Sequence, residues 1–486
     1  MARATQLTDL ESLIQENPTI NYIPPSSPDY TNARMVYNAS RTDNPLAIVQ
    51  PQSHSDVCVL IKYAKRKSLP FTLRSGGHNL EGRAVVENAL LIDLRALTGV
   101  TIASDRKSAT IQGGTLQGEV GNTLWNAGLG TPIGLIPSVG YVGWAVYGGY
   151  GPFSAHWGLG ADQIIGATVV NPDGEVIHAD DALLEGIRGA GGLYGVILEL
   201  VVKVYSISKV GPGYPDLILS NWEPNTKVLK LLAGPIIFDP TDIHKTFVQY
   251  NAEYRKLEAE DIPAELTLQQ TIFNGPRGRA FAIRFVWGGD DLEEGQYWSR
   301  KIAALGPVMV NAIVPTTIPE ILANTGAHVP PRVYGSALTH NVRLISSETA
   351  EAIGRGIAKL PNNPGTMMSI HQLRGKSTKS QVASVFEARD PHFMLEILGF
   401  SNEASMQSEA EAWAAGVAED VLRASPGNVL PTGYISLYNS HFQANSSEEY
   451  LEKTYGSRIE VLKILKSRFD PENVFGLTVP TLNTLK

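Results

Sequence analysis

The feature that most constrains this chain is a glycine turn that ends in a histidine. An apolar stretch from Leu69 to Leu73, typical of a short buried strand, leads into Arg74-Ser75-Gly76-Gly77-His78. Glycines have no Cβ, so several backbone N–H groups can point the same way, and such a nest suits a phosphate or pyrophosphate. We therefore expect the turn to hold a phosphate-bearing ligand, with the histidine within reach of whatever the phosphates carry. Taken alone, a Gly-Gly-His turn is more often a strand end with a surface histidine.

A second glycine region begins at Ile136-Pro137-Ser138-Val139-Gly140 and continues to Tyr147-Gly148-Gly149-Tyr150-Gly151. Polar side chains are nearly absent from it, so we expect these glycines to let the backbone approach something flat or bulky. Three patterns follow: Gly158 to Asp162, a hairpin with an Asp-Gly turn over residues 164–177, and Arg188 to Gly192 before an apolar strand. The alternative interpretation is a glycine-rich loop system of any α/β protein.

In this order and spacing, the motifs resemble the FAD-binding domain of the vanillyl-alcohol oxidase superfamily, and within it the berberine-bridge-enzyme-like oxidases. The pattern is most similar to the 6-hydroxy-D-nicotine oxidase branch of that group. The resemblance implies FAD as the cofactor, with His78 bonded covalently to the 8α-carbon of the flavin and the preceding turn holding the pyrophosphate. Members with two covalent bonds carry a cysteine just before the proline of the second loop. Ile136 takes that place here, so the resemblance implies a link through His78 only.

The resemblance also implies which residues bind the cofactor. They lie in the two glycine loops, at the start of the strand after Arg188 to Gly192, and near the C-terminus: Arg74, Ser75, Gly76, Gly77, His78, Asn79, Gly82, Ser138, Val139, Gly140, Gly143, Gly148, Gly149, Gly151, Val196 and Asn439. We expect no metal site, because the ten histidines are scattered and no Cys-x-x-Cys occurs. The sequence also has no Gly-x-Gly-x-x-Gly and no P-loop, which argues against a dinucleotide fold of the NAD type.

We predict an α+β fold with a discontinuous FAD-binding domain, made of two α/β subdomains, and a substrate domain in which an antiparallel sheet is backed by helices. The predicted divisions are an N-terminal arm (1–41), the FAD-binding domain (42–205), the substrate-binding domain (206–431) and a C-terminal segment (432–486) that returns to the FAD-binding domain. Within the substrate domain, Met367 to Leu373 and His392 to Leu398 are predicted as neighbouring strands of one sheet.

Three residues are candidates for a catalytic base: Tyr434, Tyr438 and His371. We predict a strand from Gly433 to Asn439, and period-two alternation then places Tyr434, Ser436 and Tyr438 on one face. A phenol acts as a base near neutral pH only if its pKa is lowered. Core packing is the alternative for both tyrosines, and a lone strand histidine is more often structural. An amine substrate that binds in its neutral form needs no base.

Composition narrows the function classes. The net charge of −8 and the lack of a basic tract argue against nucleic acid as a partner. No apolar run is long enough to span a bilayer, and the first residues lack the apolar core of a secretory signal, which favours a cytoplasmic or other intracellular enzyme. The single cysteine, Cys58, precludes an intrachain disulfide and is predicted to be a small buried hydrophobe.

The resemblance implies an FAD-dependent oxidase that removes a hydride from a small apolar metabolite, such as an alkaloid, a phenol or a polyketide-like compound, with O₂ as acceptor. The absent cysteine favours such a substrate over an oligosaccharide, because bicovalent attachment often accompanies open sugar clefts. A carbohydrate oxidase, and a flavoprotein cyclase or pericyclase of the same fold, are the alternatives. The expected partners are the small-molecule substrate and O₂, with no nucleic acid and no membrane, and the expected state is a monomer or homodimer.

Overall fold

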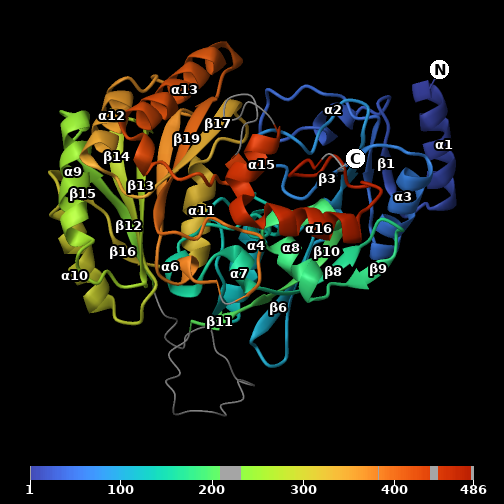
Figure 1. The fold of residues 1–486 in the computed structure, drawn as a ribbon, viewed down its shortest axis with the longest axis horizontal. Helices are drawn as coiled ribbons and strands as arrows, with labels where there is room; N and C mark the ends of the chain where they lie inside the picture. The colour runs from blue at the N-terminus through green and yellow to red at the C-terminus, as the bar shows by residue number, and fades with distance from the viewer. Residues whose placement is uncertain (1, 208–230, 381, 438–446, 483–486) are drawn as a thin grey trace.

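The computed structural model describes residues 2–207, 231–380, 382–437 and 447–482 of this chain. Within these residues, a four-stranded, a five-stranded and an eight-stranded β-sheet organise the fold. Figure 1 shows the two smaller sheets together in the half that holds the N-terminus, and the eight-stranded sheet in the other half with helices on its outer side. This combination of helices with largely antiparallel sheets confirms the predicted α+β class.

The four-stranded sheet has the order β1 (Asn21–Ile23), β2 (Ala47–Gln50), β4 (Leu90–Asp93) and β3 (Phe71–Arg74). Strands β2, β4 and β3 are parallel, and β1 pairs antiparallel at the edge. Helix α3 (His54–Arg66) packs on this sheet and begins where the Ser53 hydroxyl accepts a hydrogen bond from the Asp56 N–H. The predicted N-terminal arm therefore also contributes to the sheet: it contains α1 (Ala2–Glu16), β1 and α2 (Tyr30–Ala33), and Leu10 of α1 is buried in the same core.

The five-stranded sheet is antiparallel, in the order β5 (Val100–Ile102), β6 (Ser108–Gln112), β10 (Val196–Lys203), β8 (Ile164–Val170) and β9 (Val176–His178). The pairing of β8 with β9 confirms the predicted hairpin. The helices around this sheet are α4 (Gln117–Asn126), α5 (Tyr141–Ala145), α6 (Ser154–Trp157), α7 (Gly160–Gln163) and α8 (Asp181–Ala190), and β7 (Leu129–Gly130) pairs with β11 (Tyr205–Ser206) beside it.

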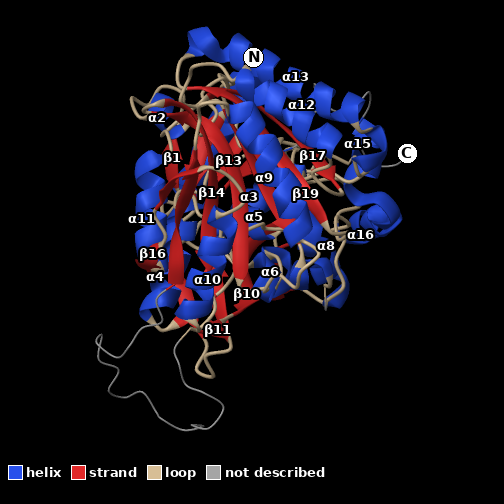
Figure 2. Cartoon of the chain, turned by 90° about the vertical axis from the view of Figure 1, so that its left-hand side faces the viewer, coloured by secondary structure: helices blue, strands red, loops and turns tan. Residues whose placement is uncertain are grey.

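The eight-stranded sheet, called the large sheet below, runs β15 (Val308–Asn311), β12 (Leu231–Phe238), β14 (Gly278–Trp287), β13 (Leu266–Gly275), β18 (Met367–Leu373), β19 (His392–Ser401) and β17 (Tyr334–Val342), with β16 (Val314–Thr316) also paired to β12. The predicted neighbours β18 and β19 are paired antiparallel. Its outer side carries α9 (Ile243–Leu257), α10 (Leu292–Ala303), α12 (Ser347–Ala358) and α13 (Gln407–Ala424). Figure 2 views the molecule from that side, with α9, α12 and α13 in front of the strands, whereas α11 (Ile318–His328) lies on the opposite side and contacts α4.

The two faces of the large sheet differ because successive side chains of a strand point to opposite sides. The outer face is apolar and packs under the helices through Leu268, Ile272, Met368, Ile370, Leu395 and Ile397. The inner face, defined here by Gln269, Arg284, Ser369, His371 and Glu396, is turned toward the two smaller sheets: the His371 ring lies 6.2 Å from that of Tyr150.

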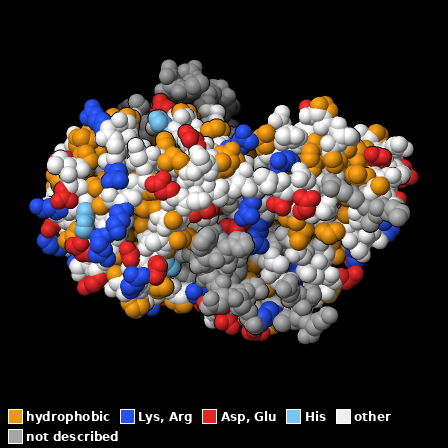
Figure 3. Space-filling view, turned by 90° about the horizontal axis from the view of Figure 1, so that it is seen from above, with side chains coloured by type: hydrophobic (Ala, Val, Ile, Leu, Met, Phe, Trp, Pro, Cys, Tyr) orange, Lys and Arg blue, Asp and Glu red, His pale blue; other side chains and the backbone are white. Residues whose placement is uncertain are grey.

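The C-terminal helices α15 (Ser447–Tyr455) and α16 (Ile459–Phe469) return to the half that holds the smaller sheets, as Figure 1 shows for the red segment beside α8. Lys466 anchors α16 there by a hydrogen bond to the Leu193 carbonyl at 3.0 Å, and it also pairs with Asp470, at the end of the same helix, at 2.5 Å. None of the helices in the described ranges is both long and apolar enough to cross a membrane. On the face that Figure 3 shows, acidic and basic side chains of the described residues are interspersed.

The prediction of a strand from Gly433 to Asn439 was wrong for the part that the structure describes. Residues Ile435–Leu437 form a 3₁₀ turn, closed by the Leu437 N–H donating to the Tyr434 carbonyl at 3.0 Å. Tyr434, Ile435 and Leu437 are all buried, so the alternation of a strand does not apply to them. Tyr438 and Asn439 lie outside the described residues.

Candidate active site

Arg74, the first residue of the glycine turn, is held by partners within the protein. Its Nη2 lies 2.6 Å from Asp93 Oδ2, and its Nη1 donates to the Ala33 carbonyl at 2.6 Å. Burial raises the pKa of Asp93, but hydrogen bonds from Arg95 and Arg74 outweigh it and lower that pKa to about 2. Since β3 and β4 are parallel and register Arg74 opposite Asp93, this pair fixes the point at which the chain leaves the sheet.

The rest of the turn contacts the second glycine loop. Gly76 lies so close to Gly140 that a Cβ on Gly76 would stand 2.2 Å from the Gly140 nitrogen. The Ser75 hydroxyl donates to the Gly113 carbonyl at 2.8 Å, and the Gly77 carbonyl accepts from the Tyr37 N–H at 3.0 Å. The structure thus brings together two loops that the sequence analysis assigned to one cofactor, and glycine at both positions permits the contact.

His78 lies where the two loops meet. Its Nε2 is 2.9 Å from the Ser138 Oγ, and its ring stacks on that of Tyr37 with centroids 4.4 Å apart. Burial lowers the pKa of His78 to about 4, so the imidazole is neutral near pH 7 and keeps one nitrogen lone pair. A neutral imidazole is the form that can act as a nucleophile.

The residues after His78 shape the end of this loop. Asn79 accepts a hydrogen bond from the Arg83 N–H through its Oδ1 at 3.2 Å, and Gly82, at φ +64°, packs against the Arg41 side chain. Across the junction, the Val139 carbonyl accepts from the Gln117 N–H at 2.9 Å. Asn79, Gly82 and Val139 therefore have structural roles in this loop pair in addition to the cofactor contacts expected of them.

The glycines of the second region are packed mainly against other parts of the protein. A Cβ on Gly148 would lie 2.6 Å from the Phe386 ring, one on Gly149 2.9 Å from Gly160 Cα, and one on Gly151 2.2 Å from the Ile133 carbonyl oxygen. Only Gly143, among the four, has nothing within 4 Å of a Cβ built on it. Three of these glycines therefore allow close approach of other parts of the protein, and their predicted contact with the cofactor stays a prediction.

Val196, the remaining predicted cofactor contact within the described residues, is fully buried at the start of β10, where it pairs with Val170.

A connected group of polar side chains lies on the inner face of the large sheet. Gln269 Nε2 is 2.5 Å from Ser369 Oγ and 3.1 Å from His371 Nε2. His371 Nε2 lies 3.0 Å from Ser369 Oγ and 3.3 Å from Glu396 Oε2. His371, one of the predicted base candidates, therefore has a carboxylate neighbour that the sequence analysis did not name.

Glu396 connects this sheet face to the histidine loop. Burial raises the pKa of Tyr37 to about 12, and the negative charge of Glu396 adds to the effect. The Tyr37 ring stacks on His78, so the tyrosine that contacts the histidine loop is also the one whose pKa the Glu396 charge affects. The inner face and the His78 loop therefore both lie near Tyr37.

Tyr434 is buried at the edge of this site, with its ring centroid 5.0 Å from that of Tyr150. Burial raises the pKa of Tyr434 to about 12; Glu396 adds to this, while hydrogen bonds involving Ser436 and the Gly149 backbone partly offset it. A phenol with this pKa stays protonated near pH 7, so it can donate a hydrogen bond but is a poor proton acceptor.

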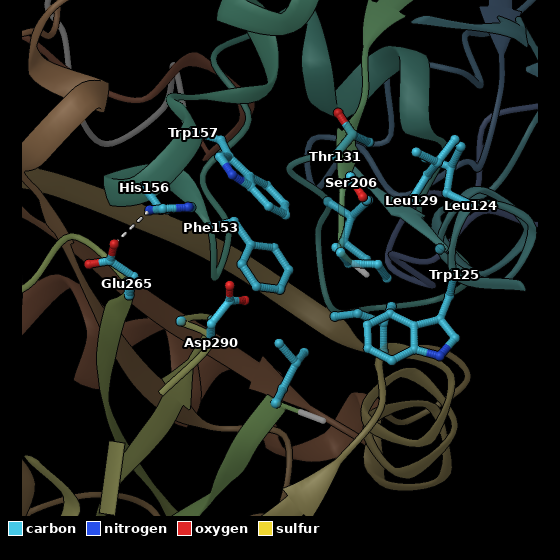
Figure 4. A pocket seen from close by; sticks show the side chains of 18 residues that line it. Leu124, Trp125, Leu129, Thr131, Phe153, His156, Trp157, Ser206, Glu265 and Asp290 are labelled. Atoms are coloured by element: carbon cyan, nitrogen blue, oxygen red, sulfur yellow. Dashed lines mark ion pairs between the residues drawn. The ribbon is translucent and has the colours of Figure 1, made fainter. Parts of the chain in front are cut away.

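A separate cavity of about 360 Å³ opens on the same face of the large sheet, beyond the ends of β13 and β14. Figure 4 shows the rings of Phe153, Trp157 and Trp125 in its wall and the His156–Glu265 ion pair at its rim. The Thr267 hydroxyl donates to the Pro152 carbonyl between this cavity and the polar group, and no predicted site residue lines the cavity.

The sequence analysis missed Glu396, Arg284, Gln269 and Tyr37. Glu396 carried a usable signal, because it is the one acidic residue in the apolar run from His392 to Leu398. Tyr37 carried none, since only the tertiary fold brings it to His78. Among the described residues, no group of three or more His, Cys, Asp or Glu side chains could hold a metal ion.

The residues present fit an FAD molecule. A neutral histidine, an adjacent hydroxyl on Ser138 and two contacting glycine loops are the expected surroundings of a linked flavin and its pyrophosphate. Gln117 Nε2, beside the second loop, is a buried donor with no hydrogen-bond partner among the described residues.

Comparisons with known proteins support FAD as the cofactor. Residues 45–180 match the family model described as an FAD binding domain. The chain is 29% identical over 470 residues to the FAD-linked oxidoreductase aurO of Gibberella zeae, covering 96% of this chain and 86% of the relative. It is 24% identical to the (R)-6-hydroxynicotine oxidase of Paenarthrobacter nicotinovorans, over 90% of this chain and 92% of that protein. The fold matches a solved variant of berberine bridge enzyme with a TM-score of 0.80 and 19% identity, covering 98% of this chain and 100% of that one.

The fold and the matched domain define the chain as an FAD-linked oxidoreductase. Its fold is that of berberine bridge enzyme and 6-hydroxy-D-nicotine oxidase, as the order of the glycine motifs predicted.

Proposed function

We propose that this protein is an oxidase that holds FAD through one covalent bond, from His78 to the 8α-carbon of the flavin, and oxidises a small, largely apolar metabolite with O₂ as acceptor. The observation that carries the proposal is the position of His78, whose Nε2 lies 2.9 Å from the Ser138 hydroxyl and whose ring stacks on Tyr37, a tyrosine whose pKa is raised by burial and further by the Glu396 carboxylate. Forming the bond removes the imidazole proton and one hydrogen of the 8α-methyl group, and O₂ takes up the two electrons.

The cofactor is held by the residues of the two contacting loops, with the backbone N–H groups near Gly76 and Gly140 at the pyrophosphate and Gly143 leaving open space on its side. Arg74 contributes indirectly, because its ion pair with Asp93 fixes the turn that holds the cofactor. Ile136 has no thiol, so it cannot form a second covalent bond to the flavin. The chemistry supplied by bound FAD is two-electron oxidation, with a hydride accepted from the substrate and O₂ as the final acceptor.

The inner face of the large sheet, in the segment 206–431, binds the substrate. Glu396 takes the substrate proton, since it is the carboxylate of this face, and His371 at 3.3 Å orients it. Tyr434 stays protonated and donates a hydrogen bond. A deprotonated hydroxyl or amine on the substrate favours loss of a hydride from the adjacent carbon.

The linkage is tested by denaturation. Wild-type protein precipitated with acid should keep its yellow colour in the pellet, whereas His78→Ala should release all flavin into the supernatant. His156→Ala is the matched control, because it removes another partly buried histidine of the same half that pairs with Glu265 instead. Flavin that washes out of denatured wild type would contradict the proposed bond.

The reaction type is tested by a peroxide-coupled screen of alkaloids, phenols, polyketide-like compounds and oligosaccharides. Oxidase activity predicts one peroxide per substrate consumed. Turnover of a substrate without peroxide would favour a cyclase, and peroxide formation with oligosaccharides alone would favour a carbohydrate oxidase.

A further inference from the structure

Arg284 has surroundings unlike those of the other arginines in the interior. It is partly buried on β14, yet among the described residues no side chain or carbonyl makes a hydrogen bond or ion pair with its guanidinium. The other buried or partly buried arginines all donate hydrogen bonds within the chain: Arg34, Arg41, Arg74, Arg83, Arg188, Arg374 and Arg389.

An unpaired guanidinium in this position needs a partner. Burial lowers the pKa of Arg284, while the negative charge of Glu396 opposes the effect, and a guanidinium stays charged in proteins. Removing such a charge from water without a partner is costly, which is why interior charges are normally paired. Since the described chain supplies none, a ligand is the expected partner.

The position of Arg284 on the inner face defines what this ligand must offer. Strand register places Arg284 opposite Gln269, Gln269 opposite His371, and Ser369 opposite Glu396, so these side chains share one face. Strands β14 and β19 are three strand spacings apart, or about 14 Å at ~4.8 Å per spacing. A cation therefore stands at one end of the face and a carboxylate at the other, with the hydrogen-bonding side chains of Gln269, Ser369 and His371 between them.

We propose that Arg284 binds an anionic oxygen of the substrate, a carboxylate or an aromatic oxyanion, while the carbon to be oxidised lies at the Glu396 end. This inference rests on the proposed function in one respect, that the inner face binds the substrate. The planar guanidinium presents two parallel N–H donors, which match a carboxylate in a bidentate pair. The substrate is thus a small, largely apolar molecule with one acidic group, and its reacting hydroxyl or amine is remote from that group.

The test compares two probes of the same shape, benzoate and benzamide, titrated calorimetrically into the protein as purified. A hydrogen bond to a charged group contributes about 1.5–3 kcal/mol, so wild type should bind benzoate about 10- to 150-fold more tightly than benzamide. Arg284→Met and Arg284→Gln should both lose this preference, and Arg284→Lys should keep part of it. Arg279→Met is the control, because Arg279 is on the same strand but donates to the Leu360 carbonyl.

Two results would overturn the proposal: no preference for benzoate in wild type, or the same preference in Arg284→Met and Arg284→Gln. A change in sulfite affinity of the flavin in these variants, with the benzoate preference intact, would show that the arginine faces the cofactor instead. The probe titration can be measured whether or not the flavin is bound covalently. The two hypotheses can therefore fail separately.

Discussion

The two faces of the large sheet are built from the same strands, but they differ in chemistry. Along β18, Met368 and Ile370 enter the apolar core under the helices, while Ser369 and His371 join the polar group on the inner face. On β19, Leu395 enters that core and its neighbour Glu396 points the other way. Because successive side chains of a strand point to opposite faces, one residue contributes to stability and its neighbour to the chemistry of the site. The two faces should respond to mutation in opposite ways.

The largest effect is expected for Glu396→Gln. The amide keeps the shape and loses the ability to accept a proton, so the rate of flavin reduction by substrate should fall about 10²–10⁴-fold. Stopped-flow absorbance measures this rate, and the reaction of the reduced enzyme with O₂ should be unchanged. Glu403→Gln, in the exposed segment after β19, serves as the control. If substrate reduced the flavin of Glu396→Gln at the wild-type rate, the inner face would have no part in the reaction.

One residue away, Leu395→Ala should act on stability instead. Truncating a fully buried leucine typically lowers the free energy of unfolding by about 2–5 kcal/mol, and Leu395 has no exposed surface. Urea denaturation measures the loss, while turnover per bound flavin should stay near wild type. Leu344→Ala is the control, because that side chain is 41% exposed. Equal losses of stability in both variants would break the contrast between the faces.

Tyr434→Phe distinguishes a hydrogen-bond donor from a proton acceptor within the site. Because the pKa of Tyr434 is raised to about 12, the variant should lose one hydrogen bond and not a base. A net hydrogen bond is worth about 0.5–1.5 kcal/mol, so flavin reduction should slow about two- to tenfold. A loss as large as that of Glu396→Gln would instead identify Tyr434 as the proton acceptor.

The smallest expected effect is a loss of stability at mildly acidic pH. Burial lowers the pKa of His392, on the inner face, to about 4. Between that value and the ordinary pKa near 6.5, the unfolded chain binds a proton that the folded chain does not, so stability rises with pH across this window. Between pH 7 and 6, this histidine should account for a loss of about 0.7 kcal/mol. His392→Gln should remove that part of the pH dependence, as measured by urea denaturation at the two pH values.

Local sequence was informative wherever a short motif controls the backbone. The turn before His78, the β8–β9 hairpin and the pairing of β18 with β19 were all predicted, because glycine turns and apolar alternation act over a few residues. The strand prediction failed within the described residues because Tyr434, Ile435 and Leu437 are all buried around a 3₁₀ turn, which alternation cannot reveal. The roles of Gly148 and Gly151 depend on Phe386 and Ile133, which only the tertiary structure brings near.

The polar group on the inner face was only partly predictable for the same reason. His371 was named from its strand, but its importance comes from Glu396 and Gln269 on neighbouring strands. Arg284 has the sequence context of an ordinary strand arginine, and only the folded structure shows that the described residues give it no partner.

The contact between Asn38 and β17 has a consequence for how the protein is made. The Asn38 side chain donates to the carbonyls of Leu80, in the His78 loop, and Gly335. The latter partner is 297 residues further along the chain, which at a synthesis rate of ~5–20 residues per second corresponds to about 15–60 s on the ribosome. Until β17 has emerged and paired, the loop lacks its final support. Maturation of the histidine site is therefore a late event that follows docking of the two halves.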